Sequence, residues 1–217
     1  MKVVLRIGGS VLIPSEINRD VLAVLVNQVE KIRHAHKIFL VVGGGRTARR
    51  YITAARNYHA TEETLDNLGI LSSQLNALLL ATCITEAELV RDIHEAIHAR
   101  GLPVLGGTTP GQTTDTVAAL LAEAVDAKIM IKVTSVGGIF TADPAQDVTA
   151  KKISKMSFKQ LKSFSEKEFE AGISSVIDPV AAAIISRNSL KTIVIGAEDM
   201  KDLEKVLAGN HSGTVIG

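Results

Sequence analysis

Short apolar runs alternate with longer amphipathic stretches along the chain. A short, continuous apolar run that ends at glycine or at a polar turn residue is typical of a strand buried on both faces of a sheet. The β-branched residues in these runs favour strands over short helices. The runs predict buried strands at residues 3–7, 38–42, 102–105, 129–133 and 192–195.

The stretches between these runs carry apolar residues at the three- and four-residue spacing of an amphipathic helix. Thr61 fits an N-cap, and Asp178 fits one that is followed by Pro179 at the first helical position. Ser157 and Gln160 fit a capping box. We expect helices at residues 19–33, 47–58, 62–81, 86–100, 117–123, 158–164, 180–189 and 200–208.

This alternation predicts an α/β fold, a three-layer αβα sandwich whose central, mostly parallel sheet is covered by helices on both faces. We expect a single domain over residues 1–217, since no linker or repeat interrupts the pattern. In such sheets ligands bind beyond the carboxyl ends of the strands. Glycine-rich turns follow several predicted strands, which points to anions that bind backbone N–H groups there. These turns lie at residues 8–10, 43–45, 106–111 and 137–138.

The stretch 105–123 is the most informative part of the chain. A glycine pair and a Pro-Gly pair mark two turns, and Thr113, Thr114 and Asp115 then stand directly before a strongly helical segment. A helix N-terminus attracts anions, but the carboxylate of Asp115 would repel a phosphate unless a cation lies beside it. The pattern fits phosphate chemistry assisted by a metal, lysine or arginine, and it equally fits an ordinary threonine-capped connection. Since asparagine also caps well, we expect Asp115→Asn to fold with little loss of stability.

Composition and charge narrow the class of protein. With 217 residues, 46% of them apolar and 22% charged, the chain can bury a full core. A net charge of +1 and 3% aromatic residues provide neither the electrostatic footprint nor the stacking residues of a nucleic-acid-binding protein. No stretch has the length of a membrane span or the pattern of a signal peptide, so we expect a cytoplasmic protein without nucleic-acid or membrane partners.

Several residues that could carry chemistry have simpler interpretations. Cys83 lies in an apolar helical stretch and is interpreted as a small buried side chain rather than a reactive thiol. His94 and His98 lack the neighbouring acid of a metalloprotease, so we expect both at the surface. The basic cluster 151–155 is typical of a solvated loop. Neither a P-loop nor the spaced dinucleotide-binding fingerprint is present.

Five motifs in a fixed order carry a resemblance to a known family. They are Ile7-Gly8-Gly9-Ser10, Val41-Val42-Gly43-Gly44-Gly45-Arg46 with Ala48-Arg49, Gly106-Gly107-Thr108 with Pro110-Gly111 and Thr113-Thr114-Asp115, Thr141-Ala142-Asp143-Pro144, and Ser175-Val176-Ile177-Asp178. In these motifs, from Met1 to Ile216, the chain resembles the uridylate kinases of archaeal type, a branch of the amino-acid kinase superfamily. The resemblance implies the amino-acid kinase fold and transfer of the γ-phosphoryl group of MgATP to UMP, giving UDP in pyrimidine nucleotide biosynthesis. It also implies a homohexamer.

The resemblance also implies site residues. It gives the N-terminal half most of the UMP site and the oligomer contacts, and the C-terminal half most of the ATP site. The residues implied for ATP are Gly9, Ser10, Gly45, Arg49, Thr134, Phe140 and Asp143. Those implied for UMP are Gly44, Asp66, Thr108, Thr109, Pro110, Gly111, Gln112, Thr113 and Thr114. The implied catalytic residues are Arg6, Arg49, Asp115 and Asp178, of which the two acids would organise cationic groups and Mg²⁺ around the phosphoryl group.

From the residues alone, some of these assignments have plain alternatives. Asp66 fits a solvated acid on a helix, Phe140 fits a core residue, and Asp143 fits a turn acid before proline. The cofactor implied is Mg²⁺ that enters with ATP, and no residue is assigned as a metal ligand.

The chain also departs from the pattern of the family. Arg6 stands where lysine is common, Gly137 where an acid is common, and Ser135, Phe140 and Thr109 replace a common asparagine, tyrosine and histidine. Two further functions therefore stay open. One is a relative that phosphorylates a carboxylate, a carbamate or an isoprenoid phosphate, although residues 46–51 lack the histidine of the isoprenoid kinases. The other is a non-catalytic nucleotide sensor or storage protein.

Overall fold

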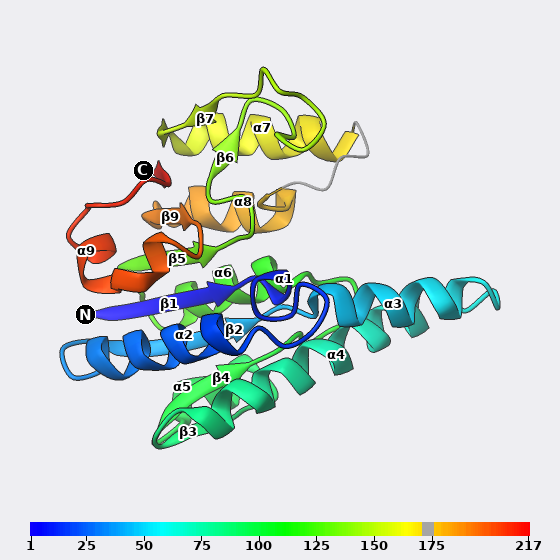
Figure 1. The fold of residues 1–217 in the computed structure, drawn as a ribbon, viewed down its shortest axis with the longest axis horizontal. Coiled ribbons are helices and arrows are strands. Elements are labelled where there is room, and N and C mark those ends of the chain that lie inside the picture. The colour runs from blue at the N-terminus through cyan, green and yellow to red at the C-terminus, as the bar shows by residue number, and fades with distance from the viewer. Residues whose placement is uncertain (171–175) are drawn as a thin grey trace.

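A mostly parallel sheet is the centre of the structure, a computed structural model that describes residues 1–170 and 176–217. Strand β1 (Lys2–Ile7) lies between β2 (Lys37–Val42) and β5 (Ile129–Val133) and pairs in parallel with both. The sheet in the described part of the chain has eight strands, in the order β3-β4-β2-β1-β5-β9-β10-β8. Figure 1 labels β3, β4, β2, β1, β5 and β9, which follow one another in this order from the bottom of the view upward. The outer strands are β3 (Ala87–Leu89), β4 (Leu102–Leu105), β9 (Thr192–Ile195), β10 (Thr214–Ile216) and β8 (Lys155–Met156).

Two strands run against the others. β10 pairs antiparallel with β9, and β8 pairs in parallel with β10. As a result Ile216, near the end of the chain, lies opposite Thr192 at the start of β9. Both chain ends therefore lie at the edge of the sheet where the parallel strands begin, and Figure 1 shows N and C on the same side.

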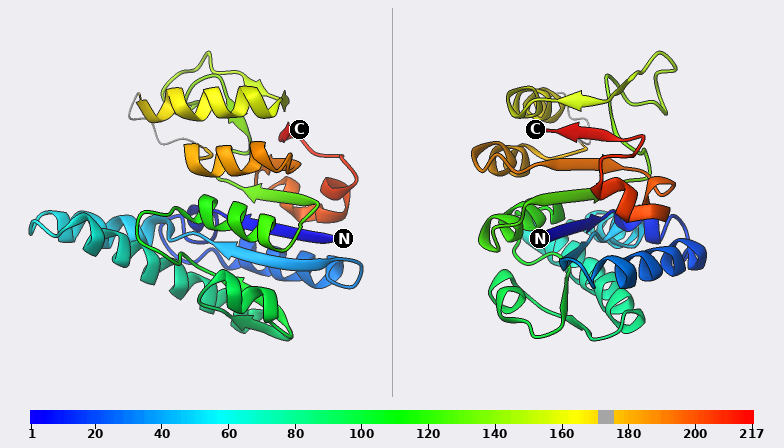
Figure 2. Two further views of the ribbon diagram at one scale, coloured as in Figure 1. Left: turned by 180° about the vertical axis from the view of Figure 1, so that it is seen from behind. Right: turned by 90° about the vertical axis from the view of Figure 1, so that its left-hand side faces the viewer.

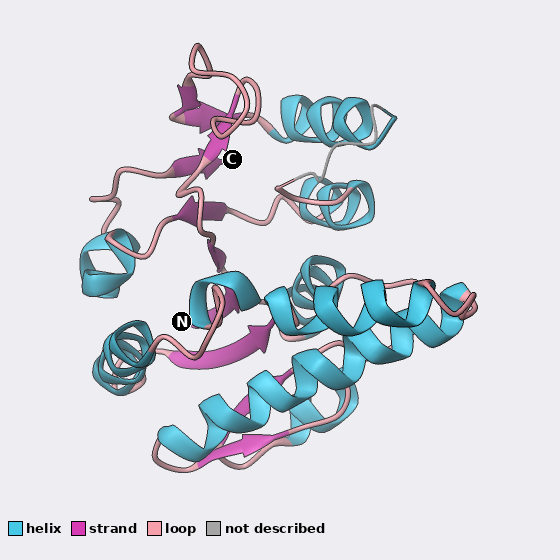
Figure 3. Cartoon of the chain, turned by 45° about the vertical axis from the view of Figure 1, so that its right-hand side comes forward, coloured by secondary structure: helices cyan, strands magenta, loops and turns pink. Residues whose placement is uncertain are grey.

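Helices cover both faces of the sheet, because alternate strand residues point to opposite faces. On one face Val3, Leu5 and Ile7 pack against buried residues of the helices α1, α2, α4, η1 and α9. On the other face Val4 and Met130 pack against α5, α6, α7 and α8. Figures 2 and 3 show the strands between these two helical layers, as expected for a three-layer αβα sandwich.

The helices have the following bounds. On the first face they are α1 (Gly9–Leu12), α2 (Arg19–Ile32), α4 (Glu62–Cys83), the 3₁₀ helix η1 (Asp199–Asp202) and α9 (Leu203–Leu207). On the second face they are α5 (Ile93–His98), α6 (Thr114–Ala124), α7 (Phe158–Glu170) and α8 (Pro179–Arg187). Helix α3 (Gly45–Arg56) packs against α4, and the two extend beyond the sheet (Figure 1).

Most predicted elements are confirmed. All the predicted strands are present, and each helix expected before residue 86 is found within a few residues of its expected ends. Thr61 and Asp178 cap their helices as predicted. The capping box of α7 is also present, since Ser157 and Gln160 exchange hydrogen bonds of 2.8 and 3.3 Å.

The helix predicted at 86–100 is wrong. The segment divides into the edge strand β3 and the short helix α5. Glu86 adopts a positive φ of 52°, which breaks a helix before it starts, and Asp92 then caps α5 by accepting a hydrogen bond from the Glu95 N–H. The helical spacing of the apolar residues could not separate a short edge strand from a helical turn.

Three smaller expectations also need correction. Residues 151–155 are not a loop, because they contain β7 (Lys152–Ile153), which pairs with β6 (Ile139–Phe140), and the start of β8. Cys83 is exposed, since it is the last residue of α4 and points away from the buried stripe. The helix predicted at 200–208 begins with the 3₁₀ turn η1 and continues as α9. Ser175, part of the last motif, lies outside the described residues.

Candidate active site

The glycine turns after β1 and β2 pack directly against each other at the carboxyl edge of the sheet. A Cβ atom on Gly9 would lie 2.3 Å from both the carbonyl oxygen of Gly43 and the nitrogen of Gly45. Gly45 has a φ of +62°, which other residues rarely adopt. The close approach therefore requires glycine at both positions, and it leaves the first N–H groups of α1 and α3 at the same edge.

Arg49 connects these two turns through its side chain. It lies on the first turns of α3, and its Nη2 donates a hydrogen bond of 3.0 Å to Oγ of Ser10 in α1. The guanidinium is exposed, so it can also reach a ligand at this edge. The residues expected at the ATP phosphates, Gly9, Ser10, Gly45 and Arg49, are thus brought together.

A cavity of about 300 Å³ opens beside this edge, between α3, α4 and the segment that leads into α6. Six of the residues expected to bind UMP line the cavity: Gly44, Asp66, Gly111, Gln112, Thr113 and Thr114. The Oδ2 of Asp66 accepts a hydrogen bond of 2.6 Å from the Gly111 N–H, so the acid on α4 holds the loop before α6. Thr109 and Pro110 are exposed at the tip of that loop, and Thr108 is half-buried.

Polar residues of α4 hold the glycine turns from behind. The buried Asn76 side chain donates to the carbonyl oxygens of Gly43 and Gly44, at 2.8 and 3.2 Å. Ser73 accepts a hydrogen bond of 2.7 Å from the Gly107 N–H. Sequence reasoning missed both residues. The available signal was their position. Both lie on the same buried face of α4 as Ala77 and Leu80, and a polar side chain on a buried face needs a hydrogen-bond partner.

A buried charge cluster lies where β1, β5 and α6 meet. Nε of Arg6 lies 2.8 Å from Oδ1 of Asp115, an ion pair without hydrogen-bond geometry, and Nη2 of Arg6 donates to Oγ1 of Thr114 at 2.8 Å. Nζ of Lys132 lies 2.5 Å from the other oxygen of Asp115 and also donates to the carbonyl oxygen of Val176. Asp115 is 7% exposed, so its carboxylate is buried, and each of its oxygens lies beside a cation.

Lys132 is a site residue that sequence reasoning missed. Its predicted strand was treated as a uniform apolar run, yet a lysine inside such a run was the signal. Lys132 is the register partner of Arg6 on the neighbouring parallel strand. Paired residues in a parallel sheet face the same side, so the two cations share the face that α6 covers.

The charges change the proton affinities of this cluster. Burial alone raises the pKa of Asp115, but Arg6 and Lys132 outweigh it and hold the pKa below the ordinary 3.8. Burial lowers the pKa of Lys132 to about 8, even though Asp115 favours its charged form. At neutral pH the cluster therefore contains a carboxylate between two cations. Of the cations that the sequence allowed beside Asp115, an arginine and a lysine are present.

The N-terminus of α6 is held to that of α8 by Asp178. Thr113 is the N-cap of α6 and accepts hydrogen bonds of 3.1 Å from the N–H groups of Asp115 and Thr116. The hydroxyl of Thr113 donates to Asp178 at 2.6 Å, and that of Thr116 donates to it at 3.0 Å. Asp178 also caps α8 through the Val180 N–H. Asp115 is consequently not the cap of α6 but its second residue.

The remaining residues expected at ATP lie on the connection from β5 to β7. Oγ1 of Thr134 accepts a hydrogen bond of 2.9 Å from the Gly137 N–H. Phe140 packs under the Lys152 ammonium, whose nitrogen lies 5.5 Å from the ring centre. Oδ1 of Asp143 accepts from the Ala145 N–H, as a turn acid does. These contacts are local to 134–152 and do not by themselves join Phe140 or Asp143 to the glycine edge.

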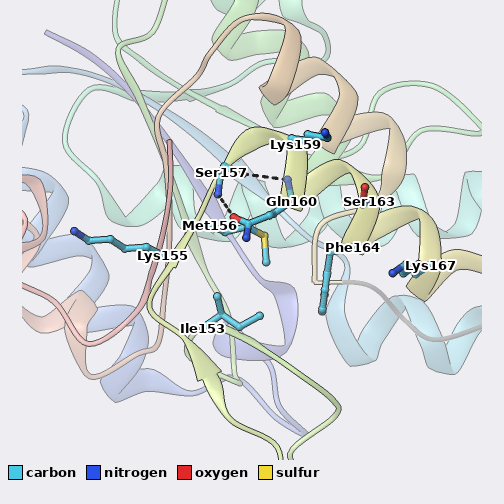
Figure 4. A pocket seen from close by; sticks show the side chains of 9 residues that line it. All are labelled: Ile153, Lys155, Met156, Ser157, Lys159, Gln160, Ser163, Phe164 and Lys167. Atoms are coloured by element: carbon cyan, nitrogen blue, oxygen red, sulfur yellow. Dashed lines mark hydrogen bonds between the residues drawn. The ribbon is translucent and has the colours of Figure 1, made fainter.

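Two larger cavities contain none of the predicted site residues. One of about 410 Å³ lies between α7 and the β7–β8 segment, with Met156 and Phe164 in its wall and the capping box of Ser157 and Gln160 at one end (Figure 4). The other, of about 450 Å³, lies beside the start of β2 at the opposite edge of the sheet. Size alone therefore does not identify the site, and the residues that line the cavity of about 300 Å³ do.

Within residues 1–170 and 176–217, His, Cys, Asp and Glu form no group of three that could hold a metal ion. The same residues include no helix that is long and apolar enough to cross a membrane.

Comparisons with known proteins identify the family. The chain matches the amino acid kinase family over residues 1–196. A uridylate kinase from Pyrococcus abyssi is 42% identical over 223 residues, which cover 100% of this chain and 99% of that protein. The crystal structure of uridylate kinase from Archaeoglobus fulgidus has a TM-score of 0.87 and 39% identity, and all of both chains is covered.

A more distant structure shares the fold. The crystal structure of UMP kinase from Bacillus anthracis superposes on this one with a TM-score of 0.81 at 21% sequence identity. The match covers 100% of this chain and 95% of that chain. The resemblance that the motifs carry is thereby confirmed. The chain belongs to the amino acid kinase family and, within it, to the uridylate kinases.

Proposed function

We propose that this protein is a UMP kinase, which transfers the γ-phosphoryl group of MgATP to UMP and gives UDP and ADP in pyrimidine nucleotide biosynthesis. The observation that carries the proposal is the full-length match to uridylate kinases, joined to a cavity beside the paired glycine turns. The domain is single and spans residues 1–217, with most of the acceptor site in the N-terminal half and most of the donor site in the C-terminal half.

UMP occupies the cavity between α3, α4 and the loop before α6. Asp66 accepts hydrogen bonds from the ribose hydroxyls, and its contact with the Gly111 N–H supports this role because the acid already faces the loop. Gly44 and residues 108–114 surround the nucleotide. Thr114 meets its phosphate, since Oγ1 of Thr114 lies beside the Arg6 guanidinium and in the wall of the cavity.

ATP places its phosphates over the glycine edge. Gly9, Ser10 and Gly45 offer backbone N–H groups at this edge, and Arg49 can bridge phosphate oxygens from its exposed position. Thr134, Phe140 and Asp143 hold the adenosine. Gly137 stands in this ATP-binding half of the site, at a position where an acid is common in the family.

The reaction needs positioning and charge neutralisation more than a base. An oxygen of the UMP phosphate forms a bond to the γ-phosphorus while the bond from that phosphorus to the β–γ bridging oxygen breaks, and ADP leaves with the electron pair. Arg6 and Arg49 stabilise the charge that moves onto the oxygens. The ion pair with Asp115 and the hydrogen bond to Thr114 fix the orientation of the Arg6 guanidinium beside the cavity, so its charge is in place before a phosphate binds.

Mg²⁺ enters as part of MgATP. Both oxygens of Asp115 are next to cations, and Asp178 accepts bonds from hydroxyls and N–H groups, so neither acid is free to serve as a dedicated ligand in the described arrangement. Mg²⁺ commonly binds substrate phosphates and keeps several waters, which needs few protein ligands. Asp178 and Asp115 would then hold the cationic groups around the phosphates.

A homo-oligomer, with the homohexamer as the expected state, is part of the proposal. Leu71, Leu75 and Leu78 follow one another along α4 at helical spacing and are 62%, 61% and 45% exposed. An exposed apolar stripe of this kind favours burial against another copy. Light scattering of the wild type and of a Leu71→Glu, Leu75→Glu double variant tests it. A wild-type monomer, or a variant with unchanged mass, would contradict the proposal.

One acceptor panel tests the function. UMP, CMP, dUMP and isopentenyl phosphate, each with MgATP, are assayed in parallel for diphosphate products. UDP formation well above that of every other product is expected. A preferred isopentenyl phosphate would identify the other acceptor class, and tight UMP binding by calorimetry without turnover would identify a sensor or storage protein.

A further inference from the structure

Lys132 is a buried lysine in the sheet, next to the site but shielded from it. It is 4% exposed and stands one residue before the end of β5. Its ammonium donates to Asp115 and to the carbonyl oxygen of Val176. Since a buried ammonium is costly unless it is paired, both contacts are needed to hold it in the charged form.

These contacts join three segments that are distant in sequence. Asp115 belongs to the first turn of α6, and Val176 lies two residues before Asp178. Asp178 in turn accepts hydrogen bonds from Thr113 and Thr116 of α6. Lys132 therefore closes a ring of contacts between β5, the start of α6 and the start of α8, which positions both acids together.

Stability alone is a weak reason to keep such a lysine, because apolar residues often replace buried ion pairs without loss. We propose that Lys132 is a positioning residue for phosphoryl transfer, which fixes Asp115 opposite Arg6 and fixes the backbone before Asp178. The inference rests on the proposed function. Lys132 acts through Asp115 rather than on the nucleotide, because its ammonium is covered and already has two acceptors.

The position predicts a pH effect as well. The charged groups that face Lys132 are Arg6 on β1, Asp115 on α6 and Asp178 before α8. With a pKa of about 8, Lys132 loses its proton in mildly alkaline solution, and Asp115 then keeps a single cation. We expect the kcat of the wild type to decrease at alkaline pH with an apparent pKa near this value. In Lys132→Arg the decrease should begin at a higher pH than in the wild type, because the guanidinium keeps its proton.

The experiment measures UDP formation by the wild type, Lys132→Met, Lys132→Arg, Asp115→Asn and the Lys132→Met, Asp115→Asn double variant. Lys128→Met, an exposed lysine just before β5, is the control. We expect Lys132→Met to lower kcat roughly 10- to 100-fold while the KM for UMP changes little, because misplaced catalytic groups cost turnover. Lys132→Arg should recover part of kcat. The double variant should be no slower than Asp115→Asn, since both changes affect one unit.

Clear outcomes overturn the inference. Near-normal kcat in Lys132→Met would do so, as would independent, multiplicative losses in the double variant. If Lys132→Met does not fold, Lys132→Arg and the wild-type pH profile decide, and an alkaline limb that does not move in Lys132→Arg overturns the inference. A wild type that makes no UDP refutes the proposed function instead, so the two failures are distinct.

Discussion

The guanidinium of Arg49 donates a hydrogen bond to the hydroxyl of Ser10, 3.0 Å away, and so joins the first turns of α3 to α1. Both residues follow glycine turns whose backbones touch. An exposed arginine gains little from a single surface contact, so the contact by itself adds little stability. Its value is that the guanidinium is already held over the edge where the proposed phosphates bind.

Arg49→Ala should lower kcat roughly tenfold or more, in the range expected when a preorganised charge is lost. Thermal stability should change little, because the side chain is exposed. Steady-state kinetics with UMP and MgATP, beside a melting curve, check this. Arg50→Ala, one residue further on the same helix and also exposed, is the matched control, and equal turnover in the two variants would remove Arg49 from the site.

Asp66→Asn should raise the KM for UMP well above any change in the KM for ATP. The carboxylate both holds the Gly111 N–H and, in the proposed site, accepts bonds from the ribose, so its loss costs about 1–3 kcal/mol of binding. Titration of each substrate separately gives the two constants. Glu63→Gln, one turn earlier on α4 and exposed, serves as the control. Equal increases for both substrates would argue against an acceptor role.

Asp115→Asn should now be destabilising, contrary to the expectation from the sequence. The sequence suggested a cap that asparagine replaces, but the cap is Thr113, and the charge of Asp115 lies between the buried Lys132 and the partly buried Arg6. Removal of the charge leaves Arg6 and Lys132 facing each other, which should cost about 3 kcal/mol. Turnover should fall sharply as well. Urea unfolding and kcat measure the two effects, and a variant as stable as the wild type would mean that the cations are solvated.

Gly9→Ala should be poorly tolerated, because its Cβ would lie 2.3 Å from backbone atoms of the turn after β2. Neither backbone can move freely, so we expect a loss of about 1–3 kcal/mol, together with slower turnover. Gly69→Ala on α4 is the control for stability, since its Cβ would meet only a side-chain atom at 3.7 Å and alanine favours a helix. Similar melting temperatures for the two variants would contradict the close approach.

The sequence predicted the layers of the fold because its strands are short apolar runs that the sheet buries on both faces. The run 38–42 and strand β2 differ by one residue. It could not predict β3, because three residues of edge strand have no periodicity of their own. Nor could it predict the direction of β10, which depends on pairing with β9 rather than on local pattern.

The site shows the same division. Glycine turns and Asp66 were accessible from motif and resemblance, and the structure places them around one edge and one cavity. The roles of Lys132 and Asn76 were not accessible in this way, since the partners of each side chain are distant in sequence. Lys132 contacts Asp115, 17 residues away, and Asn76 contacts Gly43, 33 residues away. Only the folded backbone brings such pairs together.

The reversed direction of β10 has a practical consequence. Because this strand runs against β9, residue 217 leaves the sheet on the same side as residue 1, away from the glycine edge (Figure 1). A purification tag, a fluorescent fusion or a surface linker attached at residue 1 or residue 217 would extend away from the glycine edge, where the nucleotides are proposed to bind. The protein can therefore be immobilised or labelled at either of these residues for single-molecule and calorimetric work, with the glycine edge left open to solution.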